Sequence, residues 1–174
     1  LPAQPKAGKL EYHVTLQSAA GEIALPPSGA SVIRFRGHVP TWLLVLHIIA
    51  MFGSLLLSNK ALISAIKKMI TPRDAIATLV LMMFGGLLLG PLVQYHAFDA
   101  LWTGFPFGGD LTDTKTLAAC AFWMLPLVRL KNAKWLRTTC VIAAIATLVI
   151  FSIPHSMFGS ELDYSTMKIG TAGN

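Results

Sequence analysis

Charged residues are scarce in this sequence. Asp, Glu, Lys and Arg make up 13% of its 174 residues, whereas hydrophobic residues make up 54%, and the mean hydropathy is +0.62. Soluble domains carry about 25% charged residues, so the composition disfavours an ordinary soluble domain and favours a membrane protein. The basic residues behind the net charge of +6 are not gathered into one patch with interleaved aromatic residues, so nucleic acid is not an expected partner.

The sequence also lacks the short motifs of common catalytic and cofactor sites. No phosphate-binding loop, dinucleotide fingerprint, C-x-x-C pair or zinc-protease motif is present. Ser156, Ser160 and Glu161 accompany His155 near the C-terminus, but no G-x-S-x-G elbow supports a nucleophilic hydrolase. We therefore do not expect nucleophilic catalysis.

Cysteine is nearly absent. Cys120 and Cys140 are the only two, and both lie inside apolar runs. If both runs cross the bilayer, the two thiols lie near opposite faces, which is too far apart for a disulfide. We interpret both as small buried hydrophobic residues.

Long apolar runs are abundant. Four of them cover about residues 41–58, 72–93, 114–130 and 135–153. A helix needs about 20 apolar residues to cross the hydrocarbon of a bilayer, and these runs approach that length. We therefore predict an all-α membrane protein in which residues 39–155 form a bundle of four transmembrane helices.

Polar residues mark the expected helix starts. Thr71, Pro72 and Asp74 fit the N-cap, N1 and N3 positions of the second helix. Thr112 or Asp113 is the expected N-cap of the third helix, because either precedes the third apolar run directly.

Small residues in the second run predict how its helix packs. Gly86-x-x-x-Gly90 allows another helix to approach closely in lipid. Pro91 follows directly, and a proline at this position predicts a kink in the last turns of the helix.

The basic residues set the expected orientation in the membrane. They cluster in the first and third connections between the runs, whereas the central loop and the tail, residues 156–174, are mainly acidic. By the positive-inside rule, the two basic connections lie in the cytoplasm. We therefore expect a bacterial inner-membrane protein with both termini and the central loop on the periplasmic side. The clustered residues are Lys60, Lys67, Lys68, Arg73, Arg129, Lys131, Lys134 and Arg137.

Residues 1–38 precede the apolar runs and form the expected extramembrane β segment. Residues 10–16 and 31–36 alternate apolar and polar side chains, as β-strands do, and Ala20-Gly21 supplies a turn. Two strands alone are marginally stable in water, so these strands need partners from elsewhere.

The opening residues, LPAQPKAGKLEYHV, carry a resemblance to a known fold. The P-x-Q-P segment, the glycine and the Tyr-x-Val strand resemble the approach to the penultimate strand of immunoglobulin-like or fibronectin-type sandwiches. The resemblance implies a partial sandwich whose earlier strands come from elsewhere. Residues upstream of Leu1 or a neighbouring subunit would supply them.

His47 is the one ionisable side chain deep within an apolar run. A histidine in hydrocarbon is costly unless it has a partner, so it suggests a functional site. One interpretation is an axial ligand to haem b or a hydrogen-bond partner for a quinone. The other is a neutral side chain bonded to a Ser, a Thr or a backbone carbonyl on a neighbouring helix.

The expected topology places further histidines and acids together on the outer side. His96, Asp99 and Trp102 follow the second helix, and Trp102 is a candidate for stacking on a cofactor or, alternatively, a member of an interfacial aromatic belt. Imidazole and carboxylate ligands together suit Zn, Cu or Fe. The candidate ligands of a transition metal are His38, His96, His155 and Asp99.

These features lead to one preferred function and two alternatives. The preferred function is an integral accessory or anchor subunit of a larger membrane complex, of the respiratory or photosynthetic electron-transfer kind, with lipid and other subunits as partners. The alternatives are a redox module that binds haem b or quinone, and an outer-face metal-binding protein. The pattern W-T-G-x-P-F-G-x-D-L-T-D with I-P-H-S-x-x-G-S-E-x-D-Y resembles uncharacterised polytopic bacterial membrane proteins, a resemblance that implies no established activity.

Overall fold

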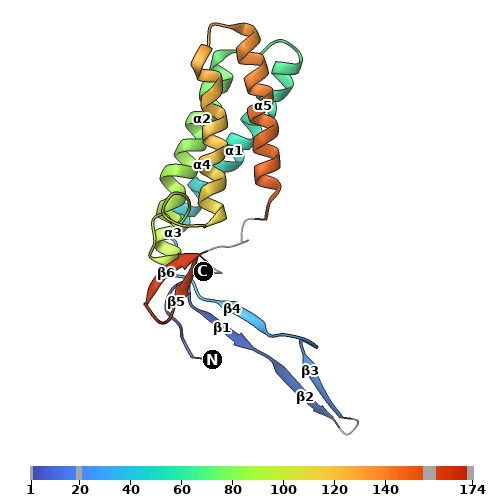
Figure 1. Ribbon diagram of the computed structural model, residues 1–174, viewed down its shortest axis with the longest axis vertical. Helices are drawn as coiled ribbons and strands as arrows, with labels where there is room; N and C mark the ends of the chain where they lie inside the picture. The colour runs from blue at the N-terminus through green and yellow to red at the C-terminus, as the bar shows by residue number, and fades with distance from the viewer. Residues whose placement is uncertain (1, 19–20, 155–159, 172–174) are drawn as a thin grey trace.

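The protein is an elongated molecule with a helical bundle at one end and a β ribbon at the other (Figure 1). The structure, a computed structural model, describes residues 2–18, 21–154 and 160–171. The N-terminal strands project away from the bundle, and the C-terminal strands lie between the ribbon and the helices (Figure 1).

The helices follow one another with short connections. α1 spans Thr41–Ile66, and α2, Pro72–Met82, continues through the π-helical segment η1, Met83–Leu89, into α3, Gly90–Phe98. After a loop, α4 spans Leu111–Met124 and continues as the 3-10 segment η2, Leu125–Arg129. The last helix, α5, spans Ala133–Ser152.

Three helices are long and apolar enough to cross a membrane. They are Thr41–Ile66, the continuous Pro72–Phe98 and Ala133–Ser152. The fourth predicted span, residues 114–130, corresponds to the 14-residue α4 and the 3-10 segment after it. The prediction of a mainly helical membrane protein with a small β segment is therefore supported, and a fourth crossing stays a prediction.

The helix starts are built from polar side chains. The predicted cap of α2 is present, because the backbone N–H and the hydroxyl of Thr71 donate to the Asp74 carboxylate at 2.9 and 2.7 Å. The predicted cap of α4 is wrong. Asp110 takes that position, accepting from the N–H of Thr112 at 2.8 Å. Asp113 instead bonds the loop before α4.

The predicted kink at Pro91 takes the form of the wider π-helical turns of η1, which end just before it. The N–H of Gly90 donates to the carbonyl oxygen of Gly85, five residues earlier. A proline offers no N–H and its ring clashes with the carbonyl four residues before it. Wider turns at this point relieve both conflicts.

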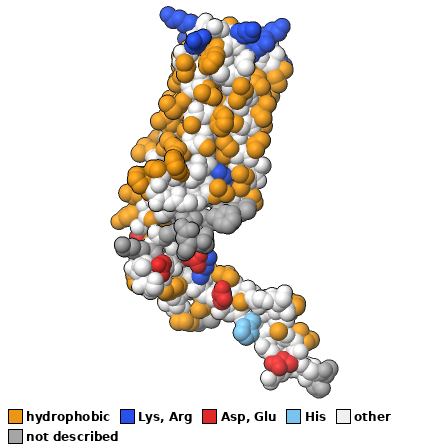
Figure 2. Space-filling model, in the orientation of Figure 1, with side chains coloured by type: hydrophobic (Ala, Val, Ile, Leu, Met, Phe, Trp, Pro, Cys, Tyr) orange, Lys and Arg blue, Asp and Glu red, His pale blue; other side chains and the backbone are white. Residues whose placement is uncertain are grey.

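The bundle core is made mostly of small residues. Alanines of all the long helices are fully buried where the helices meet, whereas large apolar side chains such as Phe52 and Val149 face outward. The result is an apolar outer surface along the length of the bundle (Figure 2). Cys120 and Cys140 are buried and unpaired, as the sequence predicts.

The N-terminal strands form one ribbon in two antiparallel sections. β1, Lys9–Tyr12, pairs with β4, Ser31–Arg34, and β2, Val14–Ser18, pairs with β3, Gly21–Leu25. The predicted strand of residues 10–16 is thus divided at His13, and β3 was not predicted. In the described part of the chain each sheet has two strands.

The C-terminal tail forms an unpredicted hairpin that packs on the N-terminal segment. β5, Ser160–Asp163, pairs with β6, Lys168–Thr171. The N–H of Leu162 donates to the carbonyl of Ala7 at 3.1 Å, and the Tyr164 hydroxyl donates to the Gln4 side chain at 3.0 Å. The described N-terminal and C-terminal segments are therefore joined to each other at the end of the bundle that carries residues 99–110, which we call the loop end.

Candidate functional site at the loop end of the bundle

His47 lies in α1 and is held by the neighbouring helix. Its Nδ1 atom is 2.9 Å from the carbonyl oxygen of Gly85 in η1. Because a carbonyl oxygen only accepts hydrogen bonds, Nδ1 carries the proton in this contact, and a neutral ring keeps Nε2 as an acceptor. The structure therefore shows the arrangement of the second interpretation, a histidine bonded to a backbone carbonyl.

Gly85 lets η1 approach α1 closely at this contact, and Gly86 lets η1 approach α4. A Cβ on Gly85 would lie 2.9 Å from the Cβ of Ala50, and a Cβ on Gly86 would collide with Thr116. At Gly90 the nearest atom would be 3.7 Å away, which is an ordinary contact. The close helix approach is thus made by Gly85 and Gly86 rather than by Gly86 and Gly90.

Asp113 organises the loop at this end. It is 7% exposed, and its Oδ2 accepts from the backbone N–H groups of Thr103 at 2.7 Å and Gly104 at 3.1 Å. Burial raises the pKa of this carboxyl, the Thr103 N–H opposes the rise, and the charge of Asp110 adds to it. Asp113 therefore ties residues 103 and 104 to the first turn of α4.

A chain of buried hydrogen bonds links three elements around Thr103. The Nε2 of Gln94 in α3 donates to the Thr103 hydroxyl at 2.6 Å. That hydroxyl donates to Oδ2 of Asp110, the N-cap of α4, at 3.1 Å. The helix before the loop and the helix after it are thus joined through one loop side chain.

Two basic side chains lie around Asp110. The Arg34 guanidinium stacks on the Phe98 ring, 4.5 Å from its centroid. Burial lowers the pKa of Arg34, and Asp110 and Glu161 oppose that effect. Lys115 also interacts electrostatically with Asp110. The loop end therefore contains a cluster of largely buried acidic and basic side chains, which we call the buried cluster.

Lys115 connects α4 to the end of α5. Its side chain is buried, and Nζ donates to the carbonyl oxygens of Ile153 at 3.0 Å and Pro154 at 3.1 Å. The last carbonyls of a helix have no partner within the helix and attract positive charge. Lys115 therefore caps α5 from a neighbouring helix.

The predicted cofactor residues His96 and Trp102 are positioned by their own segment. The His96 ring meets the Tyr95 ring edge-on at a centroid distance of 6.0 Å. The indole N–H of Trp102 donates to the carbonyls of Gly104 and Phe105 at 3.0 and 3.1 Å. Neither contact involves His47, so a cofactor site shared by the three residues stays a prediction.

Two other predicted metal ligands, Asp99 and His38, lie at the same end of the bundle. Asp99 ends α3 in a left-handed conformation and pairs with Lys6 at 2.6 Å. The N–H of Gly37 donates to the carbonyl of Ala97 at 2.8 Å, which brings the segment of the exposed His38 alongside α3. Among the described residues no three of His, Cys, Asp or Glu form a group that could hold a metal. His155 lies outside the described residues, so the full predicted set stays a prediction.

A small cavity of about 480 Å³ lies beside the Lys6–Asp99 ion pair. It is open to solvent and is lined by the N-terminal segment, the end of α3 and the C-terminal hairpin. Its lining residues are Pro5, Lys6, Asp99, Ala100, Leu162, Met167 and Ile169. Apart from the ion pair, these side chains are apolar or small, so the cavity lining has few groups that could bind or activate a substrate.

The residues of the buried cluster were only partly foreseen. Arg34, Gln94, Thr103, Asp110 and Lys115 were not predicted as site residues, and Asp113 was predicted only as a possible N-cap of the third helix. One sequence signal pointed to them. Lys115 is an isolated basic residue that follows two acids at the start of an apolar run.

Comparison with known proteins identifies no relative: no protein family, curated protein or solved structure matches the chain. The function of the chain therefore rests on its own geometry.

Proposed function

We propose that this protein is an integral membrane subunit that anchors a larger assembly and docks it through the β2–β3 section of the ribbon. The observation that carries the proposal is an exposed apolar face. Val14 lies opposite Leu25 and Leu16 lies opposite Ile23, so the four side chains share one face. They are 44–57% exposed.

The opposite face of the same section is polar or small. Thr15 lies opposite Ala24, and Gln17 lies opposite Glu22. A sheet with one apolar and one polar face buries the apolar face against a second layer. In the described part of the chain this section has no second layer, because the ribbon projects away from the helices (Figure 1).

The ribbon also has free backbone edges. A two-stranded ribbon is marginally stable alone in water, and its outer edges carry unpaired N–H and C=O groups that can pair with a further strand. The partner we propose is therefore a β-sheet surface of another subunit, which covers the apolar face or adds a strand. The resemblance of the N-terminal residues to part of an immunoglobulin-like sandwich supports the same kind of partner.

The helical part serves as the anchor in this proposal. Three apolar helices of sufficient length and a surface of outward-facing apolar side chains suit a bilayer. The loop end and both described chain ends lie at the ribbon side, so the partner, the ribbon and the tail occupy one side of the membrane. By the distribution of Lys and Arg, that side is the periplasmic one.

The test compares two double variants of the ribbon in the native membrane. Leu16→Ser with Ile23→Ser removes apolar side chains from the exposed face. Thr15→Ser with Ala24→Ser changes the neighbouring pair on the other face of the same strands. After extraction in mild detergent, we expect the wild type and the second variant to migrate with a larger assembly and the first variant to migrate alone.

A photo-crosslinker at position 16 identifies the partner in the same experiment. A crosslink to a different subunit supports the proposal, and a crosslink only to a second copy of this chain contradicts it. Equal co-purification of the two double variants, or a solitary wild-type protein in native membranes, also contradicts it. Circular dichroism of each variant checks that the helices remain folded.

A further inference from the structure

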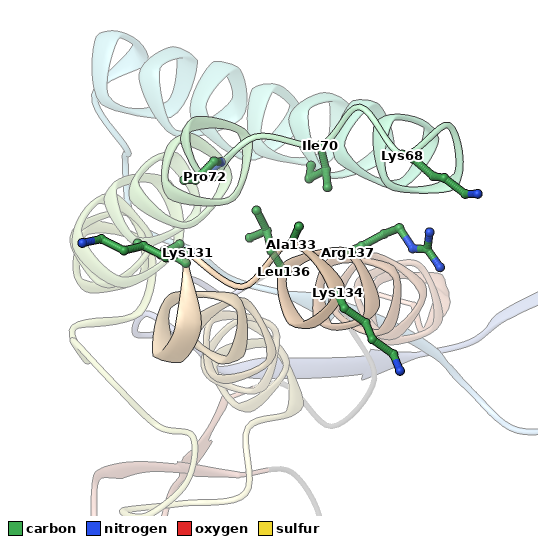
Figure 3. Close-up of a pocket in the computed structure, with 9 residues that line it drawn as sticks. Lys68, Ile70, Pro72, Lys131, Ala133, Lys134, Leu136 and Arg137 are labelled. Carbon is green, nitrogen blue, oxygen red and sulfur yellow. The ribbon is translucent and has the colours of Figure 1, made fainter.

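The end of the bundle opposite the ribbon contains the larger of the two cavities described here. It has a volume of about 800 Å³ and lies between the α1–α2 connection and the η2–α5 connection (Figure 3). We call it the basic pocket. Its lining residues are Lys68, Ile70, Pro72, Leu130, Lys131, Ala133, Lys134, Leu136 and Arg137.

The lining of this pocket carries positive charge. Four of its lining residues are Lys or Arg and none is acidic. Asp74 is the one acid near this end, and it is already bonded to Lys60 at 2.9 Å and to Thr71. The salt bridges of the described residues include none of the four pocket cations.

The interior of the pocket is apolar and its rim is cationic. Ile70 and Leu136 face one another across the gap between the two connections, and Leu136 is 3% exposed (Figure 3). Lys131 extends away on one side, and Lys68 and Lys134 extend away on the other (Figure 3). A ligand that fits has an apolar part to lie against the partly exposed Ile70 and a negative group within reach of the rim.

The position of the pocket indicates that such a ligand comes from the membrane. Lys and Arg side chains gather at this end of the bundle, directly beyond its apolar outer surface (Figure 2). In a bilayer that boundary is the depth of the lipid headgroups, where basic residues attract anionic lipids. A phospholipid supplies both required parts, because its phosphate is anionic and its acyl chains are apolar.

We propose that the basic pocket binds the phosphate headgroup of an anionic membrane phospholipid. Lys68, Lys134 and Arg137, which extend to the same side of the gap (Figure 3), hold the phosphate, Lys131 adds positive charge on the other side, and the apolar interior receives the start of an acyl chain. The lipid rests between two connections that join different helix pairs. Binding therefore links α1 and α2 to η2 and α5 at an end where the protein itself has like charges.

The test measures lipid binding to the full-length purified protein by native mass spectrometry. The probes are phosphatidylglycerol and phosphatidylcholine of matched acyl chains. The pocket variant is Lys131→Gln, Lys134→Gln and Arg137→Gln. The matched control is Lys67→Gln, Arg73→Gln and Arg129→Gln, which removes the same charge from the same end outside the pocket lining.

We expect wild type and control to bind phosphatidylglycerol in preference to phosphatidylcholine. Each cation near an anionic lipid contributes about fivefold in affinity, so the pocket variant should bind phosphatidylglycerol on the order of 100-fold more weakly. Equal losses in the two triple variants, or no preference in the wild type, would overturn the proposal by showing only diffuse charge attraction. A melting curve for each protein separates loss of the site from loss of the fold.

A competition arm distinguishes a lipid from a free anion. Inorganic phosphate at millimolar concentration should leave the bound phosphatidylglycerol in place, because it cannot cover the apolar interior. Displacement of the lipid by inorganic phosphate would assign the pocket to a soluble anion and overturn the lipid proposal.

Discussion

The Nδ1 atom of His47 lies 2.9 Å from the carbonyl oxygen of Gly85, which also accepts the N–H of Gly90. A histidine that a neighbouring helix satisfies in this way needs no cofactor to account for its place in an apolar helix. The contact also depends on Gly85 itself, because a Cβ there would lie 2.9 Å from the Cβ of Ala50 and would push α1 away.

Replacing His47 tests whether its role is structural. We expect His47→Ala to lower the free energy of unfolding by about 1 kcal/mol, the value typical of a hydrogen bond between membrane helices. The exposed His38→Ala is the control and should have no measurable effect. The measurement is unfolding in detergent followed by circular dichroism, together with an absorption spectrum. A Soret band in the wild type that disappears in His47→Ala would contradict a purely structural role and support haem b.

The buried Trp123 offers a second test of the helix packing. It is fully buried, and its indole N–H donates to the Thr147 hydroxyl at 3.0 Å. Trp123→Phe removes this bond and leaves a cavity, so we expect a loss of roughly 2–4 kcal/mol in unfolding free energy. In the Thr147→Val background the same change should cost less, because the bond is already gone. Additive losses in this double-mutant cycle would contradict coupling between the two side chains.

The bond from Lys115 to the end of α5 should be worth more than a surface ion pair. Its buried Nζ donates to two carbonyls, and hydrogen bonds from charged groups contribute about 1.5–3 kcal/mol each. We expect Lys115→Met to lower the unfolding free energy by about 2 kcal/mol. The control is Lys9→Met, which removes an ion pair with Glu161 whose side chains are 32% and 34% exposed, and it should cost under about 1 kcal/mol. Equal effects of the two variants would show that Lys115 does not cap α5.

Patterns formed by residues close in sequence were sufficient to predict parts of the helical fold. The Thr71–Asp74 cap and the long apolar runs depend on residues close in sequence, and the structure contains them. The cap of α4 was misplaced because Asp110, which caps the helix, and the two predicted candidates, Thr112 and Asp113, stand within one turn. The fold of the preceding loop determines which residue caps α4, because the Asp113 carboxylate accepts a hydrogen bond from the N–H of Thr103 and is not available as the cap.

The buried cluster and the tail contacts could not be predicted in the same way. Arg34 approaches Phe98, and Lys115 reaches Ile153, across large separations in the sequence. Such contacts exist only after helices and ribbon have packed. β3 is a different case, because Ile23 and Leu25 do alternate with Glu22 and Ala24. Its pattern is short and was recognisable only together with its partner strand β2.

Lys68 holds a backbone position that usually belongs to glycine. It follows the end of α1 with φ 59°, and the N–H groups of Lys68 and Met69 donate to the carbonyls of Ala65 and Ser64. This is a Schellman ending, in which glycine avoids the steric cost of the left-handed conformation. We expect Lys68→Gly to raise the unfolding free energy by about 1 kcal/mol, measured in detergent without lipid. Lys68→Gln is the control and should leave the unfolding free energy unchanged, because it keeps the strained left-handed conformation. Equal stabilisation of both variants would show that the gain comes from relief of charge repulsion and not from relief of backbone strain.

The exposed Asp163 should titrate far below an ordinary aspartate. The Ser165 hydroxyl, the Thr166 hydroxyl and the Ser165 N–H donate to its carboxylate at 2.6, 2.8 and 2.8 Å and lower its pKa to about 2. The usual value is about 3.9. Because the folded pKa is the lower one, the ionised carboxylate stabilises the β5–β6 turn above about pH 4, and this contribution is lost as the pH falls through about 2.

Carboxyl chemical shifts from an NMR titration measure the pKa of Asp163. Ser165→Ala should raise it more than Thr166→Val does, since the Ser165 hydroxyl is the largest cause of the shift. A wild-type midpoint near pH 4 would show that the turn does not hold the carboxylate in solution.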